Sequence, residues 1–125
     1  MVKTMLSDCE QMVMKCIWDS DSELGVKELM EIVNEKHSRT WKLQTVSTFV
    51  ARLVKKGYLD MYRNGRTFLY RPLMTEEDYK GILFRQYVGF WSCGNAAEFI
   101  RSLCESLELT DSDKKEIREV VQAIV

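Results

Sequence analysis

The sequence predicts a mainly α-helical protein with one small β-hairpin, organised as two small domains. Apolar residues recur at helical spacing in six segments of the chain. Two further segments, rich in aromatic and β-branched residues, flank the turn sequence Arg63-Asn64-Gly65-Arg66, as in a hairpin. The only proline, Pro72, closes the hairpin, and a length of 125 residues suits one domain or two small ones. We therefore expect one domain over residues 1–73 and a second over residues 74–125.

The first helix is expected to begin after Ser7. Ser7 and Glu10 have the spacing of a capping box, and the polar residues 19–22 would end the helix. Its apolar face would be made by Cys9, Met12, Val13, Cys16 and Ile17. Leu24-Gly25 is then a short connection or a strand of a single bridge. A second helix over residues 26–36 would turn Val26, Leu29, Met30 and Val33 to one side.

The third helix is expected over residues 43–56, after a polar connection at residues 37–42. Its inward-facing residues would be Val46, Phe49, Val50 and Leu53. Gly57 can adopt the left-handed conformation that ends a helix. The two strands of the hairpin would then be residues 58–62 and 67–71, joined by four residues.

Three more amphipathic helices are expected after Pro72. Thr75 opens the first, residues 92–95 interrupt the chain, a second helix covers residues 96–107, and Thr110 caps the last. Three such helices are too few to bury their own apolar stripes. The stripes would therefore form a dimerisation domain against a second copy of the chain, or pack back onto the first domain. The predicted dimerisation residues are Tyr79, Ile82, Leu83, Tyr87, Phe90, Ile100, Leu103, Leu107, Ile117, Val120, Val121 and Ile124.

Charge is distributed unevenly along a chain whose net charge is only -1. Residues 37–71 hold eight lysines and arginines against the single acid Asp60, which gives this segment a net charge of +7. The segments before and after it each carry a net charge of -4. A basic segment in an otherwise acidic chain is typical of polyanion binding, although a solvated charged face would have the same composition.

Three helices followed by a hairpin are the plan of a winged helix-turn-helix domain. Its third helix enters the DNA major groove and its hairpin, the wing, reaches the neighbouring backbone or minor groove. Gln, Thr and Arg opposite the buried face can bond base edges, and flanking basic side chains can hold phosphates. The predicted DNA-binding residues are Lys42, Gln44, Thr45, Ser47, Thr48, Arg52, Lys55, Arg63 and Arg66. The alternative is a winged helix that binds only proteins, for which no salt-dependent DNA affinity is expected.

Three stretches of the chain resemble the penicillinase repressor family: LSDCEQMVMKCIW, TWKLQTVSTFVARLVKKGYLD and RNGRTFLYRPL. This family comprises bacterial repressors of β-lactamase and methicillin-resistance genes, together with copper-responsive repressors. The resemblance implies a homodimeric repressor whose C-terminal helices interlock and whose two winged heads bind a palindromic DNA operator. It also implies base contacts from Thr45, Thr48 and Arg52, phosphate contacts from Lys42 and Lys55, and wing contacts from Arg63 and Arg66.

Two departures limit what the resemblance implies about release from DNA. The β-lactam-responsive members are inactivated by cleavage of an Asn-Phe bond in the dimerisation region, and this sequence contains no Asn-Phe pair. The copper-responsive members end in paired CxC motifs, whereas no cysteine follows Cys104 here. Cleavage at another bond by a signalling protease stays open, and the break between residues 90 and 95 is where we expect it.

Other functional classes find less support in the sequence. An enzyme is not expected, because the only histidine, His37, has no acid or nucleophile patterned around it. No metal or cofactor motif is present, so no cofactor is expected, but Cys93 in the interhelical break leaves a thiol- or metal-responsive regulator open. No apolar run could span a membrane and no signal peptide is evident, so we expect a cytoplasmic protein.

Overall fold

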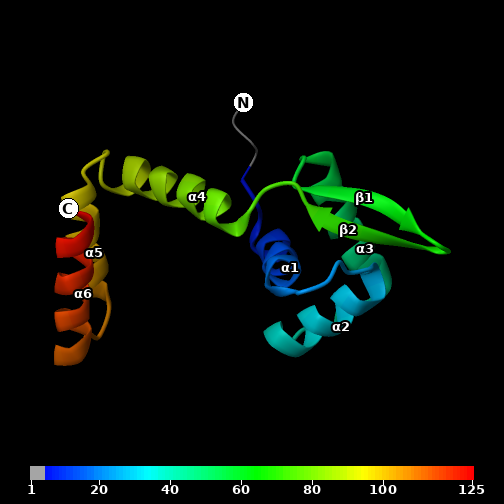
Figure 1. The fold of residues 1–125 in the computed structure, drawn as a ribbon, viewed down its shortest axis with the longest axis horizontal. Helices are drawn as coiled ribbons and strands as arrows, with labels where there is room; N and C mark the ends of the chain where they lie inside the picture. Colours follow the sequence, from blue (N-terminus) through cyan, green and yellow to red (C-terminus); the bar gives the residue numbers. More distant parts are fainter. Residues whose placement is uncertain (1–4) are drawn as a thin grey trace. The chain divides into compact units, whose positions relative to one another are not determined.

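The computed structural model describes residues 5–125, which form six helices and one two-stranded antiparallel sheet (Figure 1). In chain order the elements are α1 (Asp8–Asp19), α2 (Val26–His37), α3 (Leu43–Lys55), β1 (Leu59–Asn64), β2 (Thr67–Pro72), α4 (Glu76–Trp91), α5 (Ala96–Ser106) and α6 (Asp111–Ile124). The prediction of a mainly helical protein with one hairpin after the third helix is confirmed. The described residues divide into two compact units, residues 5–81 and residues 82–125.

Most of the helices begin at a capping side chain, whereas α2 and α3 begin without one. The Ser7 hydroxyl accepts a hydrogen bond from the Glu10 amide at 3.2 Å, and the Glu10 carboxylate accepts one from the Ser7 amide at 2.8 Å. This is the predicted capping box of α1. A second capping box, between Thr110 and Asp113, starts α6, and the side chain of Asn95 caps α5. The Thr75 hydroxyl accepts from the Asp78 amide at 3.1 Å at the start of α4, so side chains cap four of the six helices.

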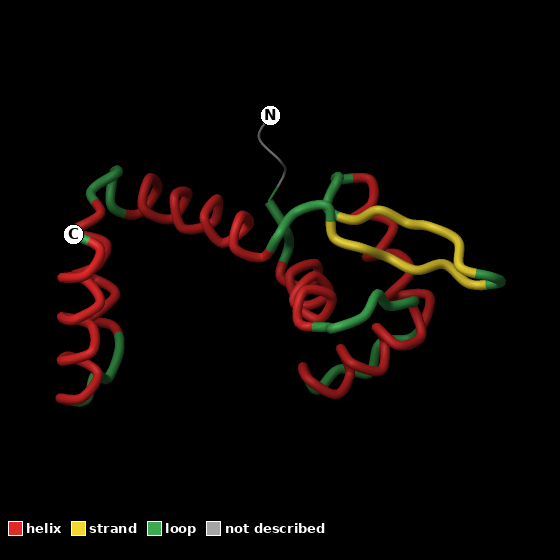
Figure 2. The backbone as a smooth tube through the Cα atoms, in the orientation of Figure 1, coloured by secondary structure: helices red, strands yellow, loops and turns green. Residues whose placement is uncertain are grey.

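The first unit has a core in which α1, α2 and α3 pack together with the base of the hairpin (Figure 2). Its most deeply buried apolar side chains are Val13, Met14, Leu29, Val33, Val46, Val50, Leu53, Tyr58 and Leu59. Helix α3 contributes three of them at helical spacing, so one of its faces is fixed against the core and the opposite face points outward. Burial of these side chains, each worth about 1.5–3 kcal/mol, is what orients α3.

The hairpin is tighter than its sequence suggested. Asn64 pairs with Thr67, so the two strands are joined by two residues, Gly65 and Arg66, and not by the four that were predicted. Gly65 has a φ of +66°, the conformation that the first central residue of a type II′ turn requires and that glycine adopts without strain. Leu24 forms a single bridge with Tyr70 beside β2, as one of the two interpretations of Leu24-Gly25 anticipated.

The start of α4 is bound to α1 within the first unit. The indole Nε1 of Trp18 donates to the Met74 carbonyl at 2.9 Å, and the Lys15 ammonium pairs with Glu76 at 2.6 Å. Tyr79 is only 3% exposed, with its ring centroid 5.7 Å from that of Trp18 and 5.8 Å from that of Tyr58. The first compact unit therefore includes the start of α4, and the domain boundary after residue 73 stays a prediction.

The second unit consists of the remainder of α4, α5 and α6. A break at residues 92–95 separates α4 from α5, with positive φ values at Cys93 (+50°) and Gly94 (+84°). No residue from 82 to 125 is buried, although α5 and α6 are both amphipathic. The apolar stripes of these helices are thus present in the structure but not enclosed by this single chain.

Candidate nucleic-acid interface

The outward face of α3 carries most of the polar side chains that were predicted to contact DNA. Gln44, Thr48, Arg52 and Lys55 are exposed on this face, and Lys42 is exposed immediately before the helix. Thr45 and Ser47 are half-buried, so they present less surface than the helical pattern suggested. The Thr48 hydroxyl donates to the Gln44 carbonyl oxygen at 2.9 Å, one turn earlier in the same helix.

Phe49 is not a core residue of the kind that was predicted. Its side chain is half-buried, whereas Val46, Val50 and Leu53 are at most 1% exposed. The Phe49 ring packs on Trp41 with a centroid separation of 5.0 Å, and the Arg52 guanidinium lies 5.5 Å from the centre of the same ring. Phe49 therefore belongs to the rim of the outward face, because Trp41, from the connection before α3, covers it there.

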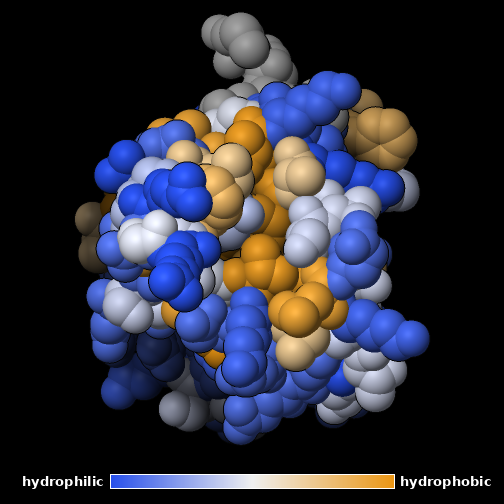
Figure 3. All heavy atoms as spheres, turned by 90° about the vertical axis from the view of Figure 1, so that its right-hand side faces the viewer, coloured by the Kyte–Doolittle hydropathy of each residue, from blue (hydrophilic) through white to orange (hydrophobic). Residues whose placement is uncertain are grey.

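The wing contributes two exposed arginines near its turn. The Arg63 side chain lies over Phe68 at 5.8 Å, and its Nε donates to the Gly65 carbonyl at 3.2 Å. Arg66 is the second residue of the two-residue turn. Figure 3 faces the hairpin side of this unit and shows hydrophilic side chains over most of the surface, around an apolar patch. The wing thus carries exposed positive charge in and beside its turn.

Two of the eight basic side chains of residues 37–71 are neutralised inside the unit. Lys56 pairs with the buried Glu10 at 2.6 Å, and Arg71 donates to Asp60 through both Nε (3.1 Å) and Nη2 (2.9 Å). Within the described residues the other six have no carboxylate within ion-pair distance: Arg39, Lys42, Arg52, Lys55, Arg63 and Arg66. These six form what we call the open basic set.

The open basic set contains one residue that the sequence analysis did not propose. Arg39 is exposed directly after Ser38, which ends α2 in the left-handed conformation at a φ of +52°. Its position in the polar connection before α3 gave no helical pattern from which a role could be derived. Only the excess of basic residues in this segment indicated that Arg39 could contribute to binding. Six cations without carboxylate partners around one helix and one wing are suited to binding phosphates.

The second unit offers apolar surface in place of charge. Seven of the predicted dimerisation residues are exposed: Tyr87, Phe90, Ile100, Leu103, Leu107, Val120 and Ile124. Ile82, Leu83, Ile117 and Val121 are half-buried. Tyr79 is the exception, because its ring is enclosed by Trp18 and Tyr58 of the first unit and is not available at a surface. Phe84 and Trp91 are also exposed, at 52% and 73%, and lay outside the predicted stripe.

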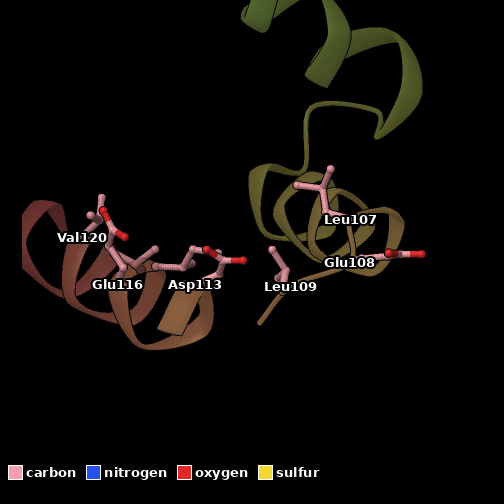
Figure 4. Close-up of a pocket in the computed structure, with 8 residues that line it drawn as sticks. Leu107, Glu108, Leu109, Asp113, Glu116 and Val120 are labelled. Carbon is pink, nitrogen blue, oxygen red and sulfur yellow. The ribbon is translucent and has the colours of Figure 1, made fainter. Parts of the chain in front are cut away.

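A groove of about 500 Å³ lies between the end of α5 and α6 (Figure 4). Side chains from α6 and from the connection that follows α5 line it, including Leu107, Leu109 and Val120. The acidic Asp113 and Glu116 stand at its edge in the close-up. An apolar groove with this lining is suited to receiving apolar side chains.

The cysteines and the histidine form no reactive cluster. All four thiols are free; Cys16 is buried, which raises its pKa, and Cys93 is exposed. Over residues 5–125 there is no group of three or more His, Cys, Asp or Glu side chains able to hold a metal ion. In the same residues no helix is long and apolar enough to cross a membrane.

Comparison with known proteins places this geometry in a family. The family model described as penicillinase repressor matches residues 6–123. The penicillinase repressor of Bacillus licheniformis is 27% identical over 117 residues, which cover 94% of this chain and 89% of that protein.

Two solved structures share the fold of the first unit. The solution structure of the DNA-binding domain of the repressor BlaI has a TM-score of 0.52 and 36% identity, covering 62% of this chain and 94% of that one. The monomeric form of Bacillus licheniformis BlaI in complex with the blaP half-operator has a TM-score of 0.51 and 36% identity, covering 62% and 92%. The resemblance inferred from the sequence is thereby confirmed, and so is the expectation that the protein is not an enzyme. The chain belongs to the penicillinase repressor family, a family of DNA-binding transcriptional repressors.

Proposed function

We propose that this protein is a homodimeric repressor in which each protomer places α3 in the major groove of one operator half-site and sets its wing beside that groove. The observation that carries this proposal is the open basic set, six cations without carboxylate partners in the described residues, on α3, its approach and the wing. Such a set attracts a polyanion at low salt and is not expected on a surface that binds an ordinary protein partner.

The side chains divide into two roles by their position. Gln44, Thr48 and Arg52 face outward along the length of α3, where base edges would lie, and Thr45 and Ser47 flank them with less exposed surface. Lys42 and Lys55 stand at the two ends of the helix, and Arg63 and Arg66 on the wing, where phosphates would pass. Arg39 joins the phosphate-binding group because it is exposed beside Lys42 in the approach to α3.

Dimerisation is proposed through the second unit. Its helices expose Phe90 at 72%, Leu107 at 53% and Ile124 at 77%, and no residue from 82 onward is buried. A second copy of the same unit could bury these side chains and fill the groove between α5 and α6. The relative that is bound to a half-operator is a monomeric form, which supports one winged head for each half-site of a palindrome.

Release is proposed to act on the second unit and not on α3. One head buries little surface, so two heads held in one dimer gain affinity from their high effective concentration at the operator. The break at residues 92–95 is exposed for most of its length and is the segment where a signalling protease would act. Cutting or loosening the chain there would lower operator affinity while leaving each head intact.

Selection from a random DNA pool with the full-length protein, at two salt concentrations, tests the proposal. We expect a palindrome whose half-sites are separated by about 10–10.5 base pairs or a multiple of that length. Five phosphate contacts per head, from Arg39, Lys42, Lys55, Arg63 and Arg66, give ten per dimer and a log–log salt slope of about -9. Failure to enrich any sequence, together with no DNA retained at low salt, would favour a winged helix that binds only proteins.

A matched pair of lysine variants sharpens this test. Lys55→Ala removes a member of the open basic set, so affinity should fall for all sequences alike and the salt slope should become shallower by about 2 per dimer. Lys80→Ala makes the same change of charge on α4, where Lys80 is already paired with Glu77 at 3.0 Å. The control should leave both the affinity and the slope unchanged. Equal effects of the two substitutions would show that only net charge matters.

A further inference from the structure

We propose that Phe49 and Trp41 are positioning residues for Arg52, holding its guanidinium ready to contact a base or phosphate before DNA arrives. This inference rests on the proposed function, because it assigns to Arg52 a place at the DNA surface. The observation behind it is a stack of three side chains at the rim of α3. Trp41 contacts the Phe49 ring at 5.0 Å between centroids, and the Arg52 guanidinium lies 5.5 Å from the centre of that ring.

The base of this stack is fixed by hydrogen bonds. Asn34 on α2 receives the Trp41 amide at its Oδ1 (2.9 Å) and donates from its Nδ2 to the Trp41 carbonyl (3.0 Å). The two bonds hold the backbone of Trp41 from both sides, although this residue lies in the connection before α3. Because Asn34 is on a packed helix, the connection cannot shift without breaking both bonds. The indole is thus a fixed surface for the Phe49 ring.

The burial of Phe49 argues for a role beyond the core. The three α3 side chains that only fill the core, Val46, Val50 and Leu53, are at most 1% exposed. Phe49 is half-buried and keeps part of its ring toward Arg52. An aliphatic side chain would fill the same volume against Trp41, but it has no π face. Only an aromatic ring attracts a guanidinium electrostatically.

A ring also holds an arginine without consuming its hydrogen-bond donors. Arg71 shows the other arrangement, because Asp60 takes two of its N–H groups and cancels its charge. In the described residues no carboxylate lies within ion-pair distance of Arg52, so its five donors and its full charge remain for DNA. A long side chain that is already ordered loses less conformational freedom on binding. The stack therefore orders the Arg52 side chain without occupying the hydrogen-bond donors that would contact DNA.

The experiment uses four full-length variants: Arg52→Ala, Phe49→Leu, the double variant of these two, and Phe49→Tyr, which keeps the ring. Affinities are measured for the selected operator and for a panel in which each base pair of one half-site is replaced. Arg52→Ala should weaken operator binding about 5- to 150-fold if it contacts a base pair. Phe49→Leu should weaken it about two- to fivefold, at the same base pairs, and Phe49→Tyr should not.

The double variant decides between positioning and simple packing. If Phe49 acts through Arg52, adding Phe49→Leu to Arg52→Ala should change affinity by less than the substitution does in the wild type. The proposal would be overturned if the two substitutions lowered operator affinity independently, so that their fold-changes multiplied in the double variant. It would also be overturned if Phe49→Leu lowered affinity equally for every sequence while Arg52→Ala lowered it only at particular base pairs. Val54→Ala, which removes apolar bulk at another half-buried position of α3, controls for loss of stability.

A measurement without DNA separates this inference from the proposed function. The ring current of Phe49 should shift the proton NMR signals of the Arg52 side chain in the free protein, and Phe49→Leu should remove that shift. Trp41→Phe, which keeps an aromatic surface under Phe49, should preserve the shift and serves if Phe49→Leu fails to fold. Unshifted Arg52 signals in the wild type would overturn the positioning role. Shifted signals in a protein that binds no DNA would leave the stack in place and refute the DNA function.

Discussion

Thr48 shows how the backbone of a helix can restrict what a side chain reads. Its hydroxyl donates to the Gln44 carbonyl oxygen at 2.9 Å, so the hydroxyl proton is not available to acceptors on DNA. What remains toward the groove is the γ-methyl group and the accepting capacity of the oxygen. The thymine methyl is the base feature that suits a methyl contact. We therefore expect Thr48 to favour thymine through its methyl group.

Two substitutions separate the methyl group from the hydroxyl. Thr48→Val keeps the methyl and should leave operator affinity nearly unchanged, whereas Thr48→Ser keeps the hydroxyl and should weaken binding roughly fourfold, the value of one buried methyl group. Replacing the contacted thymine by deoxyuridine should weaken the wild type but not Thr48→Ser. A larger loss for Thr48→Val than for Thr48→Ser would mean that the hydroxyl leaves Gln44 and reads a base.

Glu10 joins the start of α1 to the end of α3. It is 2% exposed, and its carboxylate accepts from the Lys56 ammonium at 2.6 Å. Burial acts to raise the pKa of Glu10, but hydrogen bonds from Lys56 and Ser7 outweigh it and bring the pKa below the ordinary value of 4.5. Stability from this pair is therefore fully present above pH 4.5 and lost as the pH falls through the lower, folded-state pKa.

Glu10→Gln tests the ion pair alone, because glutamine at this position can still close the capping box with Ser7. At pH 7 the free energy of unfolding should fall by about 1–3 kcal/mol, since Lys56 loses its carboxylate partner but keeps the Met5 carbonyl at 3.4 Å and, at 26% exposed, can reach water. The difference from wild type should shrink below pH 4.5, measured by urea unfolding at several pH values. Glu77→Gln, at a carboxylate that is 82% exposed, should cost almost nothing at any pH. A pH-independent difference for Glu10→Gln would contradict the linkage.

At the scale of single elements, the sequence predicted whatever depends on nearest neighbours along the chain. The capping pattern of Ser7 and Glu10 gave the start of α1, and the 3.6-residue period gave the buried side of α3 correctly at Val46, Val50 and Leu53. The prediction from this period was wrong at Phe49, because a helical wheel gives the direction of a side chain but not the residue that it contacts. Trp41 meets it from a connection that has no period of its own.

The hairpin shows a similar limit. Asn-Gly located the turn, but the number of residues in it depends on strand register, and pairing of Asn64 with Thr67 extends the first strand by two residues at the turn. Likewise, the stripe of α4 was visible in the sequence as one continuous face. Nothing in the pattern indicated that Tyr79 would be enclosed by residues from α1 and the hairpin entrance, whereas Tyr87, two turns later, stays exposed.

The first turn of α4 should therefore be needed for the winged head to fold. A fragment ending at residue 73 loses Tyr79, the Met74 carbonyl that accepts from Trp18, and the Glu76 partner of Lys15. Loss of the Tyr79 ring alone should cost about 3–5 kcal/mol, comparable to other buried aromatic truncations. We expect residues 1–81 to unfold cooperatively in urea and residues 1–73 to be largely unfolded or much less stable. Tyr79→Ala in the 1–81 fragment should reproduce most of the loss. Equal midpoints for the two fragments would place the boundary where the sequence first suggested it.

For the whole molecule, counting charges along the sequence located the basic segment but overstated what is open to a ligand. The count gave eight cations in residues 37–71, and the structure neutralises Lys56 and Arg71 with Glu10 and Asp60. Glu10 is 46 residues from Lys56 in the sequence, so this pairing follows from the packing of α1 on α3 and has no local signal. The six residues of the open basic set therefore describe the charge available to a ligand better than the eight cations counted in the sequence.

The two units also differ in kind, and this difference leads to a prediction for the intact protein. The first unit has a buried apolar core, whereas the second has none and exposes Val120 at 53% beside the groove that Leu107 and Leu109 line. In the proposed dimer, Val120→Asp would place a charge against apolar side chains of the partner, at a high desolvation cost. The dimer dissociation constant should rise by at least about tenfold, equivalent to 1.4 kcal/mol. Sedimentation analysis over a range of protein concentrations measures this change.

Lys115→Gln is the matched control, because it also makes the net charge more negative by one but lies on the polar side of α6, opposite the stripe of Ile117, Val120 and Val121. It should leave the dissociation constant unchanged. Val120→Asp should also weaken binding to the full palindrome while sparing binding to an isolated half-site, since the head and its open basic set are untouched. If Val120→Asp leaves the protein dimeric, or weakens half-site and palindrome equally, the second unit does not join two heads as proposed.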